Sequence, residues 1–174
     1  MDTFFEQIVA MRKGAKEMAL IILILVAALI VGALLMLLSI ANISFASICF
    51  LAIAGVFFGA YKLIALNNVE FEYILTNGEM DIDKITNRSS RKRQITFSLK
   101  DVLRIEKYDF SNPVVIHGAK TEVYCNKGDE NACFVLLERK SHGKTVVVFS
   151  PNDRMRQGMS GFIPRIIGGD FFKK

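Results

Sequence analysis

Two long blocks of apolar residues dominate the first part of this chain, and a region of alternating apolar and polar residues follows them. The blocks cover residues 18–40 and 44–66. At ~1.5 Å per helical residue each block reaches roughly 35 Å, enough to cross a hydrocarbon core of ~30 Å. The first block contains no charged residue and the second contains only Lys62. The pattern therefore predicts two transmembrane helices joined by a tight turn.

Two other interpretations of these blocks fail on their pattern. A core helix of a soluble protein needs a polar stripe on its outer side, and residues 20–38 have none. A secretory signal peptide has a shorter apolar run, and here a second span follows directly.

The residues before the first block, 1–17, predict an amphipathic helix. Phe4, Ile8 and Met11 fall on one helical face, and Thr3 with Glu6 fits a capping box. The helix is expected either in the membrane interface or against the chain's own cytoplasmic domain. The interfacial alternative directs three basic residues toward anionic headgroups: Arg12, Lys13 and Lys16.

From residue 69 onward the alternation predicts a β domain over residues 69–166, with a tail at 167–174. Residues 69–76 and 79–85 form a hairpin around Asn77-Gly78, a pair suited to the positive φ angles of a tight turn. Ser150 as N-cap and Pro151 as first residue predict a helix that ends near residue 162 or 163. The remaining predicted strands make seven in all: 94–98, 102–108, 121–126, 132–139 and 144–150.

This order of elements resembles a pleckstrin-homology-like (PH-like) domain, in which a C-terminal helix plugs a bent antiparallel sheet or partly open barrel. The whole chain is similar to short bacterial membrane proteins with two N-terminal spans and a cytoplasmic PH-like domain. The similarity rests on the segments 71–84, 91–93 and 149–153. It implies a fold and a location, and no catalytic residue. The phosphoinositide site of lipid-binding PH domains is a basic first hairpin, whereas this one carries Glu79, Asp81 and Asp83.

Charge predicts the orientation of the spans in the membrane. Basic residues flank the outer ends of the two blocks, and the turn between the blocks contains none. By the positive-inside rule both termini are expected in the cytoplasm of a bacterium. The three cysteines, Cys49, Cys125 and Cys133, are odd in number and one lies in a span, which makes a disulfide framework improbable.

Four basic residues between the second and third predicted strands are the sharpest charged feature: Arg88, Arg91, Lys92 and Arg93. We weigh a solvated loop, contact with anionic lipid and contact with an acidic protein partner. Near an anionic leaflet each Lys or Arg contributes about 1 kcal/mol of attraction. The cluster contains no aromatic residue on which a base would stack, so nucleic acid is not expected as a partner.

Within the second span, Gly55 and Gly59 form a small-x-x-x-small motif, and Ala28 with Gly32 forms a weaker one in the first. Such spacing lets helix backbones approach closely. It predicts packing within the hairpin, which we favour, or joining of two copies. Neither span contains Asp, Glu, His or Arg, which argues against a transporter or channel.

The sequence contains no motif that carries catalysis or a cofactor. There is no Gly-x-Ser-x-Gly and no phosphate-binding loop, and the spacing of His117, Cys125, Cys133 and His142 lacks the close pairs of zinc sites. We therefore expect a non-enzymatic, membrane-anchored module without cofactor or metal, which binds a protein partner or the anionic membrane surface. The alternative is a structural subunit that assembles through its transmembrane hairpin.

Overall fold

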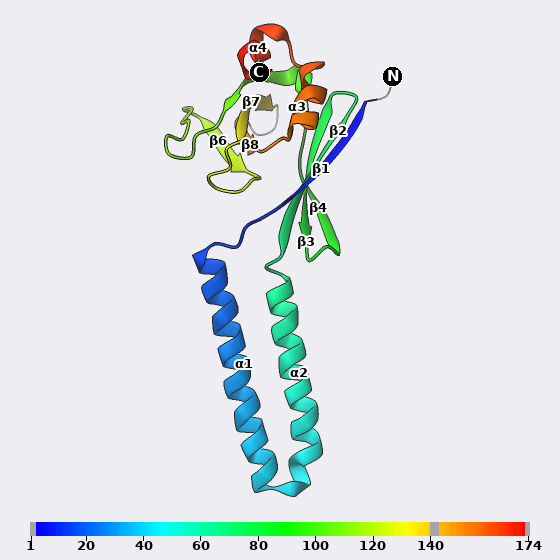
Figure 1. The fold of residues 1–174 in the computed structure, drawn as a ribbon, viewed down its shortest axis with the longest axis vertical. Helices are drawn as coiled ribbons and strands as arrows, with labels where there is room; N and C mark the ends of the chain where they lie inside the picture. Colours follow the sequence, from blue (N-terminus) through cyan, green and yellow to red (C-terminus); the bar gives the residue numbers. More distant parts are fainter. Residues whose placement is uncertain (1–2, 140–142, 173–174) are drawn as a thin grey trace. The chain divides into compact units, whose positions relative to one another are not determined.

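A computed structural model describes residues 3–139 and 143–172 of the chain. The chain divides into two compact units (Figure 1). One unit is residues 12–69, which hold the two long helices. The other combines residues 1–11 with residues 70–174, so the N-terminal segment belongs to the β unit.

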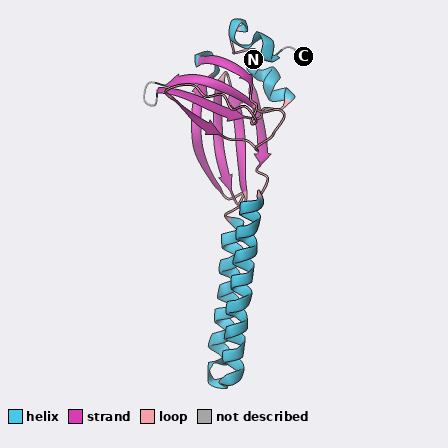
Figure 2. Cartoon of the chain, turned by 90° about the vertical axis from the view of Figure 1, so that its left-hand side faces the viewer, coloured by secondary structure: helices cyan, strands magenta, loops and turns pink. Residues whose placement is uncertain are grey.

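The helical unit consists of α1 (Ala15–Ala41), a 3-10 turn η1 (Ile43–Phe45) and α2 (Ala46–Ala65). The two helices lie side by side (Figure 2). Both are long and apolar enough to cross a membrane, and few of their side chains are buried within the structure. The two predicted apolar helices are thus confirmed.

The β unit contains two four-stranded sheets. Sheet A has the order β1-β2-β3-β4 and sheet B the order β5-β7-β8-β6. β1 and β2 are antiparallel neighbours, and the whole helical unit forms the connection between them. The strands of sheet A are β1 (Phe4–Ala10), β2 (Val69–Thr76), β3 (Glu79–Thr86) and β4 (Ser90–Ser98). Those of sheet B are β5 (Val102–Lys107), β6 (Ala119–Val123), β7 (Cys133–Arg139) and β8 (Gly143–Phe149), and η2 (Leu99–Asp101) joins the two sheets.

These sheets correct the predicted seven-stranded, partly open barrel in two respects. The described residues form eight strands in two sheets that do not close into a barrel. The sheets are also not wholly antiparallel, because β6 pairs with β8 in parallel. The connection between the predicted strands 132–139 and 144–150 lies largely outside the described residues.

Aromatic side chains join the two sheets at their facing surfaces. The ring of Phe149 on β8 packs edge-on against the rings of Tyr73 on β2 and Phe97 on β4. The distances between ring centres are 5.6 Å to Tyr73 and 6.5 Å to Phe97. The Tyr73 hydroxyl donates a hydrogen bond to the Tyr124 carbonyl at 2.6 Å and accepts one from the Ser150 N–H at 3.3 Å. Tyr73 is therefore both buried and satisfied.

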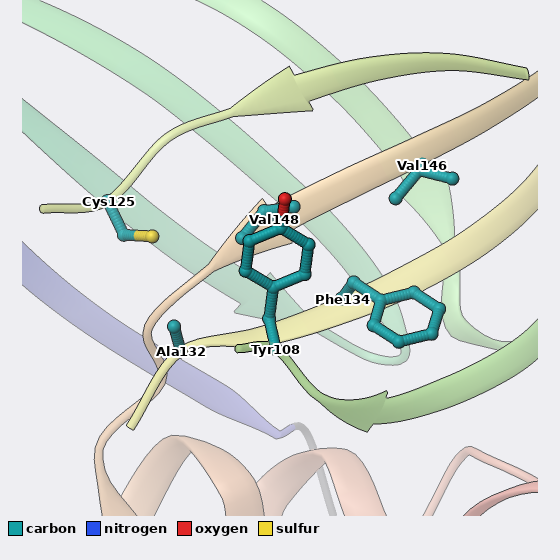
Figure 3. Close-up of a cluster of buried hydrophobic side chains, with 6 residues drawn as sticks. All are labelled: Tyr108, Cys125, Ala132, Phe134, Val146 and Val148. Carbon is teal, nitrogen blue, oxygen red and sulfur yellow. The ribbon is translucent and has the colours of Figure 1, made fainter. Parts of the chain in front are cut away.

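The opposite face of sheet B has its own apolar cluster (Figure 3). Tyr108 covers Phe134 of β7 and Val148 of β8, while the irregular segment after β5 adds Phe110 and Val114. Sheet B is thus buried on both faces, which accounts for its nearly continuous run of buried residues in β8.

The N-terminal segment is a strand and not the predicted amphipathic helix. Phe4 and Ile8 share a side in both arrangements, because residues four apart coincide in a helix and also in a strand. Pairing with β2 decides between them, from Phe4 opposite Thr76 to Ala10 opposite Glu70. Alternate residues of β1 turn inward, as their exposure pattern shows.

The C-terminal end is also more complex than the single helix that the sequence predicts. α3 covers Asp153–Ser160 and α4 covers Arg165–Phe172. The cap of α3 is Asn152, whose side chain accepts a hydrogen bond from the Met155 N–H at 2.8 Å. Ser150 does not cap the helix, because α3 begins at Asp153, and the Ser150 backbone is instead bonded to Tyr73 and Gln7.

Candidate functional site

Charged side chains form a ladder across β2, β3 and β4 of sheet A. Three arginines from β4 and the preceding turn each pair with carboxylates on β2 or β3. The ion pairs are Arg88 with Glu70 at 3.1 Å, Arg91 with Glu72 at 2.7 Å, and Arg93 with Asp81 at 2.8 Å and Asp83 at 2.6 Å. Acidic and basic residues that the sequence shows as separate groups are therefore partners.

The ladder is partly buried. The side chain of Glu72 is 0% exposed and that of Asp83 is 4% exposed, whereas those of Arg91 and Arg93 are about half exposed. Burial raises the pKa of Glu72, and the neighbouring carboxylates Glu6 and Asp83 raise it further, against the attraction of Arg91. One oxygen of Glu72, Oε2, has no hydrogen-bond partner among the described residues.

The predicted basic loop is consequently a strand. Arg91, Lys92 and Arg93 lie within β4, and only Arg88 lies in the turn before it. Lys92 is exposed and, within the described residues, has no ion-pair partner. Arg88 is paired, but its side chain remains 84% exposed. The cluster therefore contains two accessible cations, at the end of sheet A where β2 begins.

β1 is fixed to the rest of the β unit by polar contacts from one side chain. Gln7 donates to the Ser150 carbonyl at 2.9 Å and accepts from the Asn152 N–H at 2.8 Å. The Phe5 ring lies so close to Gly158 that a Cβ there would come within 2.6 Å of it. These contacts reach across most of the sequence, and no local pattern in residues 1–17 indicates them.

The interfacial helix to which three basic residues were assigned does not form, because residues 4–10 are a strand. Arg12 and Lys13 lie between β1 and α1, and Lys16 is in the first turn of α1. They still flank the first apolar helix, as the positive-inside argument requires.

The glycines of the second span do not pack the hairpin. A Cβ added at Gly55 or Gly59 would meet nothing within 4 Å. The weaker motif of the first span packs the two helices together instead. Ala28 and Gly32 are buried, and a Cβ added at Gly32 would lie 3.4 Å from the Phe57 ring. The Gly55–Gly59 face is therefore open within the described helices.

The cysteines of the β unit have the character of core residues. Burial raises the pKa of Cys125 to about 12, and complete burial raises the pKa of Cys133 well above its ordinary value. A thiol with a raised pKa is a poor nucleophile and a poor metal ligand. Among the described residues there is no group of three potential metal ligands, and His142 lies outside them.

The described chain consists of two apolar helices that fit a two-span membrane protein and a small β unit with C-terminal helices. The chain belongs to the family described as bacterial PH-like domain (DUF6106), whose model matches residues 1–168. The match includes β1 and both apolar helices, so the long insertion lies inside the family's domain. No curated protein and no solved structure matches the chain.

Proposed function

We propose that this protein is a non-catalytic, membrane-anchored module whose PH-like β unit is held at the cytoplasmic surface of a bacterial membrane and binds partners there. One observation carries the proposal: the two apolar helices are inserted between adjacent strands of one sheet. β1 and β2 can pair only if both ends of the helical hairpin emerge on the same side of the membrane. That side is expected to be cytoplasmic, since Arg12, Lys13, Lys16 and Lys62 flank these ends.

The anchoring is tested by the sidedness of introduced cysteines in intact cells. Phe4→Cys and Gly128→Cys should react with a membrane-impermeant maleimide only after the cells are opened, whereas Asn42→Cys in the turn should react from outside. The native cysteines are buried and give a low background. Labelling of Phe4→Cys from outside would overturn the proposal.

In this proposal the β unit also binds anionic lipid of the membrane surface. Arg88 and Lys92 remain accessible at the end of sheet A from which β2 connects to α2 by a short segment. A fluorophore on Asn87→Cys should be quenched by spin-labelled lipid more strongly in anionic than in neutral nanodiscs. Arg88→Ser with Lys92→Ser should remove the difference, and insensitivity to lipid charge would contradict this part.

A second candidate function is assembly through the hairpin, and the open face at Gly55 and Gly59 favours it. Small residues that no neighbouring helix covers let a further helix approach closely. Replacing both glycines with leucine should then reduce cross-linked oligomers of the full-length protein in membranes. Ala54→Leu, a change of similar size beside Gly55, is the control; equal loss in both variants would count against this function.

A further inference from the structure

β6 is an outer strand of sheet B with an open edge. It pairs with β8 on one side, in parallel, and no described strand lies on its other side (Figure 1). The side chain of Lys120 is 69% exposed, Val123 is 41% exposed, and Thr121 between them is also exposed. This edge is therefore accessible to another chain.

Half of the backbone groups of β6 point toward this open edge. The Tyr124 N–H, directly after β6, donates to the Val148 carbonyl of β8 at 2.8 Å. Because successive residues of a strand direct their backbone groups to opposite sides, Thr121 and Val123 direct theirs away from β8. In the part of the chain that the structure describes, these outward groups bond to no other backbone group.

Two opposite charges lie on one side of β6. A charged residue on an edge strand ordinarily discourages pairing with another chain. Here Lys120 and Glu122 are two residues apart and form an ion pair at 2.7 Å. In an antiparallel copy of the strand the order of the two charges is reversed, so each charge can lie opposite its counterion.

An antiparallel copy of β6 matches this edge residue by residue. With Thr121 on a two-fold axis, Lys120 lies opposite Glu122 of the second copy and Ala119 lies opposite Val123. All 5 residues of the strand then overlap. An axis at Lys120 or at Glu122 would shorten the overlap and place like charges opposite each other, which is destabilising. The sequence of β6 therefore favours one register of self-pairing.

The same register uses the outward backbone groups. The two Thr121 residues exchange N–H···O bonds across the axis, and each Val123 N–H donates to the Ala119 carbonyl of the other copy. The Ala119 N–H already donates to the Ile116 carbonyl at 3.0 Å, so the paired region ends there.

We propose that β6 pairs with β6 of a second copy of this chain, antiparallel and centred on Thr121, so that the two copies of sheet B join across a two-fold axis. The inference rests on the proposed function, because it names a second copy as one partner of the membrane-anchored β unit. It does not involve Gly55 and Gly59, which lie in α2.

The first test cross-links the full-length protein in native membranes through Thr121→Cys. Hydrogen-bonded partners in an antiparallel pair have Cα atoms about 5.5 Å apart, so a short bis-thiosulfonate reagent should join two copies. Leu103→Cys, an exposed residue of the opposite outer strand β5, is the control and should remain monomeric. Absence of the Thr121→Cys dimer, or equal cross-linking of the control, overturns the proposal.

Charge reversal in the Thr121→Cys protein tests the register. Lys120→Glu and Glu122→Lys each place like charges opposite one another, so each variant alone should lose about tenfold in cross-linked dimer. Co-expression of the two variants with different tags pairs opposite charges again and should restore a dimer that carries both tags. Single variants that cross-link as well as the unreversed protein would show that the register is wrong.

The double variant, Lys120→Glu with Glu122→Lys, keeps the ion pair within the strand and the pairs across the axis. It should cross-link as the unreversed protein does. If neither the co-expressed variants nor the double variant regains the dimer, the proposal is overturned. If the cysteine sidedness and lipid tests succeed while these cross-links fail, this inference alone is lost.

Discussion

Ala10 at the end of β1 lies opposite Glu70 near the start of β2, and the two apolar helices with their short connections lie between them in the sequence. The two helices are therefore an insertion in what is otherwise an antiparallel strand pair. This relationship changes how the β unit should be isolated, because a fragment that starts at residue 69 lacks one strand of sheet A.

We expect a soluble β unit when residues 11–69 are replaced by Asn-Gly, which joins Ala10 to Glu70 by a two-residue turn suited to hairpins. This joined β unit should elute as a monomer and unfold cooperatively on heating. Residues 69–174 alone should be much less stable, since they lack Phe5 and Gln7 and leave β2 as a bare edge. Equal melting temperatures for the two proteins would contradict the role of β1.

Gln7 should contribute more to the free energy of unfolding than an exposed glutamine does. Gln7→Ala removes two hydrogen bonds to the Ser150 carbonyl and the Asn152 N–H, and we expect a loss of about 1–3 kcal/mol in the joined β unit. Denaturant unfolding measures it. Gln157→Ala changes an exposed glutamine of α3 and should cost much less; similar losses would show that Gln7 has no special role.

Arg91 should contribute more to the free energy of unfolding than Lys92, its neighbour in β4. Arg91→Ala leaves the buried carboxylate of Glu72 without its cation. We expect a loss of about 1–3 kcal/mol, below the range for a fully buried pair because Arg91 is itself 56% exposed. Lys92→Ala is the matched control and should stay within about 0.5 kcal/mol of the wild type.

Glu72 gives the β unit a specific pH dependence. Its folded-state pKa is raised above the usual 4.5, so the Glu72 carboxyl binds a proton more readily in the folded protein than in the unfolded chain. Its contribution to stability is fully present below that ordinary value and is lost as pH rises through the raised pKa. Relative to wild type, Glu72→Gln should therefore become progressively more stable as pH rises from about 4.5 toward neutrality.

Unfolding free energies at several pH values check this prediction. Asp83 of β3, Arg91 of β4 and Glu6 of β1 face Glu72, so the comparison with Glu72→Gln isolates one carboxyl among several. A difference between variant and wild type that does not change with pH would refute it. Glu79→Gln, on the exposed end of β3, is the control.

The sequence was sufficient for elements that local pattern determines. The two apolar helices and the hairpin around Asn77-Gly78 follow from continuous hydrophobicity and from a turn that needs positive φ, which the structure shows at 49° and 87°. β1 could not be predicted because Phe4 and Ile8 suit a helix as well as a strand, and its partners lie beyond the insertion.

The charge ladder could be predicted from the sequence only in part. Glu70 with Glu72, Asp81 with Asp83, and Arg91 with Arg93 each repeat at the strand period of two, which is a readable signal. The register that brings Arg93 opposite Asp83 also depends on a bulge in the β3–β4 pair, which the sequence does not mark. α4 was not indicated by the sequence, because most of its residues fall in the segment predicted as a tail, 167–174.

The pairing of β1 with β2 in the intact membrane protein is tested most directly by cross-linking. Phe4 and Thr76 are register partners with exposed side chains, so Phe4→Cys with Thr76→Cys should form an intramolecular disulfide in native membranes under mild oxidation. Phe4→Cys with Ser98→Cys, which lies three strands away on β4, should not. Mass spectrometry of the 4–76 cross-link would establish the inserted hairpin, and its absence, or equal cross-linking of the 4–98 pair, would contradict it.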